Sequence, residues 1–155
     1  MSIKAKIVFF LVCIYFIGVA FGYNILLSNT SSLPYFLFVK TPNKEDLKTG
    51  SIVTFIYKYK DYYKYKVGQN FTKKIGCSQG EELKTVDNQF FCNGKFIGVA
   101  AIKDGVGNEL EVQDYNEIIP NGKYFMIGTN PKSFDSKYYG YIDKSDISGV
   151  TYGIF

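Results

Sequence analysis

The residue inventory of this 155-residue chain removes several common kinds of hydrolytic chemistry. The chain contains no histidine, so neither a Ser-His-Asp triad nor a Cys-His dyad can be built. A serine nucleophile would need another general base, and lysine is the established substitute when its amine is unprotonated at working pH. An exposed lysine is neutral in about one molecule in a thousand near pH 7.5, whereas burial can lower its pKa to about 5–6. A catalytic lysine in this chain must therefore lie among apolar side chains.

One pair of lysines has such a setting. Lys73 and Lys74 stand between Phe71 and Ile75 in a stretch that predicts a strand. Because side chains alternate across a strand, one lysine would point inward and the other outward. Most such pairs are solvent-exposed, so the pattern does not by itself identify a base, and Ser32 taken alone carries still less information.

The three cysteines fall in two environments. Cys13 lies in an apolar N-terminal stretch, whereas Cys77 and Cys92 lie in the rest of the chain. In a compartment that permits oxidation the latter two could form a disulfide; two buried reduced thiols are the alternative. Two cysteines without histidine do not complete the four ligands of zinc, so we expect neither a metal nor a cofactor.

The elements that must position these residues begin with an apolar N-terminal segment. Lys4 and Lys6 precede Ile7–Leu27, in which Asn24 is the only strongly polar residue. About 20 helical residues cross a hydrocarbon core, so this segment predicts one membrane span. A cleaved signal peptide is the alternative, because Ala20-Phe21-Gly22 is a passable cleavage site.

The chain is expected to consist of two parts, an N-terminal anchor and one folded domain. Residues 1–27 would be a short N-terminal stub and a transmembrane anchor, and residues 28–155 would be one domain of ordinary size. The basic N-terminal flank favours a cytoplasmic N-terminus. We therefore expect a single-pass protein of the cytoplasmic (inner) membrane with a periplasmic or otherwise extracytoplasmic domain.

That domain is predicted to be mainly β, because β-branched and aromatic runs alternate with turns rich in Gly, Asn and Asp. Leu33–Val39 would be an edge strand, to which an extended substrate could pair. Lys58–Lys66 alternates tyrosine with lysine as a half-exposed hairpin would. Other strands are expected at Ser51–Tyr59, Phe71–Ile75, Leu83–Val86, Gln89–Cys92, Lys95–Lys103 and Lys123–Gly128.

The net charge of +4 is not a sign of nucleic-acid binding. The lysines are scattered among predicted strands, and no basic helical face or nucleic-acid motif is present. Lys40, Lys44 and Lys48 cluster soon after the span and would suit an anionic membrane surface, although solubility explains them equally well.

The order of motifs resembles that of signal peptidase I, whose members are membrane-anchored Ser/Lys peptidases with a catalytic β-sheet or barrel domain. Ser32-Leu33-Pro34 is similar to the family's nucleophile box, and Gly50-Ser51-Ile52-Val53 to its Gly-Asp-Ile-Val strand. Lys73-Lys74-Ile75-Gly76 is similar to Lys-Arg-Val-Gly, in which the first basic residue is the general base. The resemblance implies that Ser32 is the nucleophile, that Lys73 is the base, and that Thr30 and the Ser32 amide form the oxyanion hole.

The longest match lies near the C-terminus. Residues 128–140, Gly-Thr-Asn-Pro-Lys-Ser-Phe-Asp-Ser-Lys-Tyr-Tyr-Gly, resemble the family's Gly-x-x-x-x-Ser-x-Asp-Ser-Arg-Tyr-Phe-Gly box. The resemblance implies that Ser133 bonds the catalytic lysine and that Asp135 and Lys137 form a supporting ion pair. Lysine in place of arginine loses the bidentate geometry of that pair.

Two features resemble the conjugative-transfer (TraF-type) branch: the context Asn29–Pro34, and Ser133-Phe134-Asp135-Ser136 without a preceding Gly-Asp-Asn. The branch implies processing of pilin precursors or other secretion and conjugation proteins with small residues near the cut, in some members with pilin cyclisation. The alternatives are a catalytically silent membrane-anchored scaffold of the same fold and a LexA-like self-cleaving Ser/Lys protein.

Overall fold

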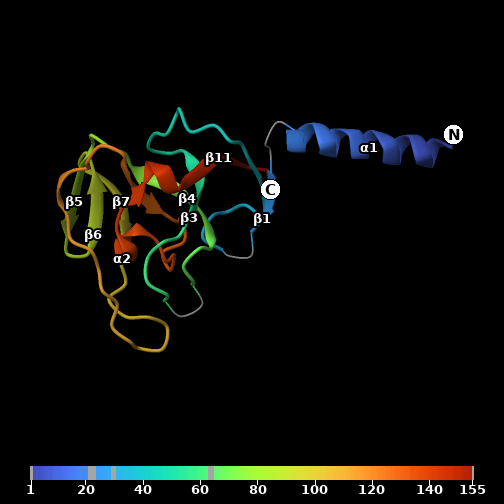
Figure 1. Cartoon of the computed structure of the whole chain (residues 1–155). Coiled ribbons are helices and arrows are strands. Elements are labelled where there is room, and N and C mark those ends of the chain that lie inside the picture. The colour runs from blue at the N-terminus through green and yellow to red at the C-terminus, as the bar shows by residue number, and fades with distance from the viewer. Residues whose placement is uncertain (1, 21–23, 29–30, 63–64, 155) are drawn as a thin grey trace.

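The computed structural model describes residues 2–20, 24–28, 31–62 and 65–154. It consists of an N-terminal helix and a β domain, and the helix projects away from that domain (Figure 1). The expectation of a mainly β fold after one apolar helix is confirmed.

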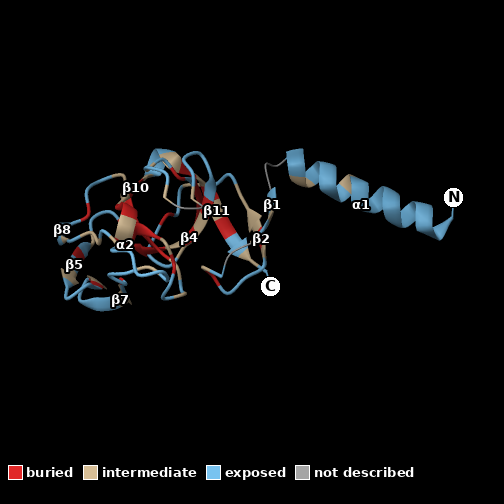
Figure 2. Ribbon diagram, turned by 90° about the horizontal axis from the view of Figure 1, so that it is seen from below, coloured by how far each residue is buried: buried red, intermediate tan, exposed pale blue. Residues whose placement is uncertain are grey.

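Helix α1 (Ile3–Ala20) has no buried residue, in contrast to the β domain, whose centre is buried (Figure 2). Its length and hydropathy are those of a membrane span, although a signal sequence has the same properties. The helix is not the expected Ile7–Leu27, because Asn24–Leu27 forms strand β1 and pairs with β2 (Leu37–Lys40) along its whole length. The sheet therefore includes residues that we had assigned to the span.

The larger sheet is antiparallel and has the strand order β1-β2-β11-β3-β4-β9-β10. Its remaining strands are β3 (Ile52–Ile56), β4 (Asn70–Cys77), β9 (Lys123–Ile127), β10 (Ile142–Asp143) and β11 (Ile147–Gly153). Among its expected strands, β3 and β9 are shorter than expected, and β4 is longer.

The expected edge strand at Leu33–Val39 is wrong in position and in kind. The strand is Leu37–Lys40, and β11 pairs with its second side, so it lies inside the sheet. The expected hairpin at Lys58–Lys66 is reduced, within the described residues, to a single bridge between Tyr62 and Tyr65.

The smaller sheet has the order β7-β6-β5-β8. Its strands are β5 (Glu82–Val86), β6 (Gln89–Cys92), β7 (Lys95–Val99) and β8 (Asn116–Ile118). Two short helical turns, α2 (Ser136–Tyr139) and the 3₁₀ turn Lys144–Asp146, complete the described elements.

Each sheet has its own apolar core. Val53, Phe55 and Ile75 are fully buried in the first, which many tyrosine and phenylalanine rings surround. Leu83 and Phe90 are fully buried in the second. β4 contributes to both cores, since Ile75 belongs to the first and Cys77 to the second. This strand therefore connects the two halves of the domain.

Candidate active site

Lys73 lies in the middle of β4, where it pairs with Val53 of β3. Its neighbours of the same parity, Phe71 and Ile75, are buried, and Lys73 itself is only 5% exposed. Lys74 is half-buried on the other face of the strand, as alternation predicts. The Lys73 Nζ donates hydrogen bonds to Ser32 Oγ at 2.6 Å and to Ser133 Oγ at 2.8 Å.

Burial also sets the charge of this amine. Desolvation lowers the pKa of Lys73 from its ordinary value of 10.5 to about 8. Asp135 opposes this change by attracting the ammonium, and Lys137 adds to it by repulsion. A substantial fraction of Lys73 is therefore neutral at mildly alkaline pH, as a general base requires.

Ser32 is held in place by a loop that follows β9. The Thr129 backbone N–H donates to the Ser32 carbonyl at 2.8 Å, and the Thr129 hydroxyl donates to the same oxygen at 3.3 Å. Next to it, Asn130 Nδ2 donates to Ser31 Oγ at 3.1 Å. The neighbour Leu33 is buried, which secures the other side of the serine.

Gly128 explains why this loop can approach so closely. A Cβ at this position would lie 2.1 Å from Ser133 Oγ and 2.9 Å from the Ser32 carbonyl oxygen. Any side chain here would displace both serines that bond Lys73.

A buried ion pair lies within the turn at the end of this loop. Lys137 Nζ donates to both carboxylate oxygens of Asp135 at 2.7 Å, and the two side chains are 3% and 0% exposed. Asp135 also accepts from the backbone N–H of Gly128 at 2.9 Å and of Lys137 at 3.2 Å. These hydrogen bonds from Gly128 and Lys137 to Asp135 fix the turn that carries Ser133.

The structure brings three of the named residues into direct contact, Ser32, Lys73 and Ser133, with Asp135 and Lys137 behind them. Thr30 lies outside the described residues.

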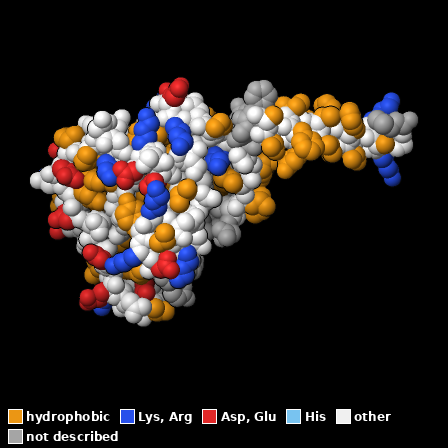
Figure 3. Space-filling view, viewed as in Figure 1, with side chains coloured by type: hydrophobic (Ala, Val, Ile, Leu, Met, Phe, Trp, Pro, Cys, Tyr) orange, Lys and Arg blue, Asp and Glu red, His pale blue; other side chains and the backbone are white. Residues whose placement is uncertain are grey.

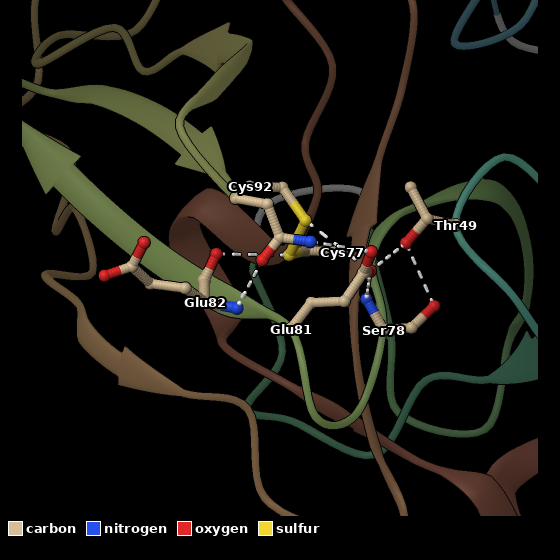
Figure 4. Close-up of a disulfide and its surroundings, with 7 residues drawn as sticks. Thr49, Cys77, Ser78, Glu81, Glu82 and Cys92 are labelled. Carbon is tan, nitrogen blue, oxygen red and sulfur yellow. Dashed lines mark hydrogen bonds between the residues drawn. A yellow bond between two sulfur atoms is a disulfide. The ribbon is translucent and has the colours of Figure 1, made fainter.

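Cys77 and Cys92 form a disulfide between the end of β4 and the end of β6 (Figure 4). With Glu81 they are the one group of possible metal ligands within the described residues. As disulfide sulfurs, however, they are not available as thiolates.

The sequence predicted Ser32, Lys73 and Ser133 as site residues, but not the residues that hold Ser32 in place. Thr129 and Asn130 received no role, although both lie in the C-terminal box. Ser136, in the same box, accepts a hydrogen bond from the Met126 N–H at 2.9 Å. Nothing in the local pattern predicts such contacts, because their partners are about a hundred residues away or on another strand.

A groove of about 440 Å³ leads to the Lys73–Ser32 contact. We call it the first groove: it lies between Leu26–Ser28 at the end of β1 and Gln69–Lys73 of β4, with Phe38 and Ser32 also in its wall. In the described part of the chain, Asn70–Lys73 pair with β3 on one side, and pairing with β9 begins only at Lys74. One edge of β4 is therefore open toward this groove.

A buried lysine bonded to two serines beside an open strand edge is an arrangement for acyl transfer. The signal peptidase family, peptidase S26, matches residues 2–155. The chain belongs to this family. Membership makes it a serine peptidase that cleaves signal peptides, with a preprotein as its substrate class.

Among solved structures, a signal peptidase I from Enterococcus faecalis V583 is similar to this chain. The two share 21% sequence identity and a TM-score of 0.47, over 68% of this chain and 97% of the other. No curated protein matches the sequence.

Proposed function

We propose that this signal peptidase cleaves exported preproteins with Ser32 as the nucleophile and Lys73 as the general base. The observation that carries the proposal is the Lys73 amine, which is 5% exposed, has a pKa lowered to about 8, and contacts Ser32 Oγ at 2.6 Å. An ordinary surface lysine has none of these properties.

In the proposed reaction neutral Lys73 takes the proton of Ser32, and Ser32 Oγ attacks the scissile carbonyl. The Ser32 backbone N–H and the Thr30 hydroxyl are proposed to stabilise the oxyanion, since such donors are typically worth about 3–4 kcal/mol. Lys73 then gives its proton to the leaving amine, so that the peptide bond breaks and an acyl-serine remains. Water, activated by Lys73, releases the product and restores both residues.

Ser133, Asp135 and Lys137 are proposed as positioning residues. Ser133 fixes the amine through its 2.8 Å hydrogen bond, and the buried Asp135–Lys137 pair fixes the turn that carries Ser133. The second bond matters because an amine held by two acceptors keeps one orientation toward Ser32.

The substrate is proposed to bind as an added strand in the first groove, along the open edge of Asn70–Lys73. The expected pairing with Leu33–Val39 is ruled out for β2, because both of its sides are already paired. Small residues near the cut are proposed from the resemblance alone, and the rings of Phe38 and Phe71 are among the residues that line the groove.

The chain is further proposed to be anchored by α1, with the domain outside the cytoplasm. Cross-strand pairs place Ile25, Val39 and Tyr152 in one row on one face of the sheet, and Ile25 and Tyr152 are 71% and 59% exposed. This apolar row begins where α1 joins the domain. The outer surface of α1 is likewise hydrophobic, with basic side chains at its far end (Figure 3).

The finer assignment, to a conjugative-transfer peptidase that processes pilin precursors, is proposed from the motif context of Ser32 and Ser133 alone. In a cyclising variant of the same reaction, the terminal amine of the substrate would replace water at the acyl-serine. In both reactions the nucleophile, water or the terminal amine, gives one proton to Lys73, and Ser32 recovers its proton from Lys73 when the acyl-serine is released.

The test is co-expression of a pilin precursor with wild type, Ser32→Ala, Lys73→Ala and the control Lys84→Ala, an exposed lysine of β5. Intact masses of the product should show cleavage by wild type and Lys84→Ala and none by the other two, with a product lighter by one water if it is cyclic. Equal processing by all four proteins would remove Ser32 and Lys73 from the mechanism. Self-cleavage that stops in Ser32→Ala, without cleavage of the precursor, would favour the self-cleaving class.

A further inference from the structure

A second groove, of about 790 Å³, continues along β4 from the point where the first one ends. Residues 69–73 line the first groove, and Lys74–Gly76 line the second. The loop Gly128–Pro131 forms one wall of the second groove, and β7 forms another. The two grooves therefore follow one strand in sequence.

The candidate nucleophile lies at their junction. Ser32 lines the first groove, and its carbonyl accepts the hydrogen bond of Thr129, which lines the second. An extended chain that crosses Ser32 would thus leave one groove and enter the other.

The position of α1 gives the direction of that chain. The first groove is bordered by β1, the strand nearest to α1, whereas β7 belongs to the smaller sheet, in the half of the domain away from α1 (Figure 1). A signal segment held in the membrane precedes the cut, so it would reach the site from the α1 side. The part that follows the cut would then point toward β7.

We infer that the second groove binds the mature-side segment of the substrate, the segment that leaves after acylation of Ser32. This inference rests on the proposed function, and it adds a specificity for residues beyond the scissile bond.

The lining of the second groove defines the chemistry of that segment. The backbone of Lys74–Gly76 forms the floor of the groove beside the apolar side chain of Ile127, and Phe96 on β7 is 52% exposed next to it. Lys74 and Lys95 also line the groove, and neither forms an ion pair within the described residues. The groove thus fits an apolar side chain followed by an acidic one.

Glu81 also lines the groove and offsets only one of these two lysine charges, and hydrogen bonds hold its carboxylate next to the disulfide. It accepts from the Ser78 N–H at 2.7 Å, from Asn93 Nδ2 at 3.1 Å and from the Thr49 hydroxyl (Figure 4). The neighbouring disulfide ties β6 to β4, and β6 pairs with β7. The wall that carries Lys95 and Phe96 is therefore fixed relative to the floor before any substrate arrives.

The test uses the full chain in detergent micelles and three substrates. All three have the same sequence before the scissile bond, which ends in Ala-x-Ala. Two are quenched peptides whose mature side carries a leucine and then either two aspartates or two lysines. The third replaces the mature side by a small aromatic amine. The variants are Lys95→Glu, Phe96→Ser and the control Lys84→Glu, an exposed lysine on β5 of the same sheet.

Wild type should prefer the aspartate peptide. Lys95→Glu should lower kcat/KM for that peptide by about fivefold, which is the effect expected from one exposed charge pair. The same variant should raise kcat/KM for the lysine peptide. Phe96→Ser should lower kcat/KM for both peptides by about tenfold, because apolar contact is lost. The aromatic amide should be cut equally by all these proteins, and Lys84→Glu should match wild type throughout.

Equal cutting of the two peptides by wild type and Lys95→Glu would overturn the inference while the aromatic amide still reports an active dyad. A parallel loss on the aromatic amide would also overturn it, since the change would then act on the catalytic residues. Failure of wild type on all three substrates would instead overturn the proposed function, and the inference with it.

Discussion

Two opposing effects act on the Lys73 amine. Burial lowers its pKa to about 8, while Asp135 favours the charged form. If neutral Lys73 is the base, kcat/KM should rise with pH and level off above about 8, because the fraction of neutral amine rises through that pKa. This rise is measured by kcat/KM against pH for the aromatic amide, which has no peptide segment after the scissile bond to bind in the second groove. A flat profile between pH 6 and 9 would contradict a lysine base.

The same burial should make Lys73 costly for stability. Below pH 8 the amine is charged in both the folded and the unfolded chain, and the shift from 10.5 to about 8 corresponds to about 3 kcal/mol of destabilisation. The unfolded chain holds more protons between these values, so stability rises with pH until the cost disappears above 10.5.

Lys73→Met should therefore raise the free energy of unfolding at pH 7, by about 1–2 kcal/mol after the loss of two hydrogen bonds. This gain should vanish near pH 10, and denaturant unfolding at both pH values measures it. A variant that is less stable than wild type at pH 7 would show that the amine is not desolvated as described.

At the scale of elements, the loop between β9 and α2 does most to assemble the site. Gly128 gives it room, Thr129 holds Ser32, and Ser133 holds Lys73. The Asp135–Lys137 pair keeps this loop in one conformation, at the cost of burying two charges.

Asp135→Ala should destabilise the protein by about 3–5 kcal/mol, because Lys137 would remain charged without its partner in a buried place. Asp143→Ala is a matched control, since Asp143 pairs with Lys123 at 2.6 Å where both side chains are more than a third exposed. It should cost less than about 1 kcal/mol. Equal effects of the two substitutions in thermal unfolding would argue against the buried pair as the fixing element.

For the whole molecule, α1 is proposed as an anchor rather than a cleaved signal, because it is apolar over its length and none of its residues is buried. The chain should stay in the membrane fraction after an alkaline wash, with an intact mass that includes residues 1–20. Phe10→Arg with Ile14→Arg should release it, because each arginine at a helix centre opposes insertion by about 2.5–3.5 kcal/mol. A soluble product that lacks the N-terminal residues would support a cleaved signal.

Much of this protein could be predicted from local pattern. The family, the mainly β fold and most strands follow from motifs and from alternation, and the structure brings Ser32, Lys73 and Ser133 together. Strand alternation predicted that Lys73 and Lys74 face opposite sides, and the resemblance to the family's Lys-Arg-Val-Gly segment selected Lys73.

Only the tertiary structure decided how distant segments pair. β11 makes β2 an inner strand, and β1 takes residues whose apolar composition alone predicts membrane helix. The second groove also exists only where the ends of β4 and β9 meet β7 and the loop Gly128–Pro131. Such contacts join residues far apart in the chain, and their energy comes from surfaces that local sequence does not specify. The sequence therefore determined the family and the candidate residues of the site, and the tertiary structure determined the contacts that hold those residues and the grooves beside them.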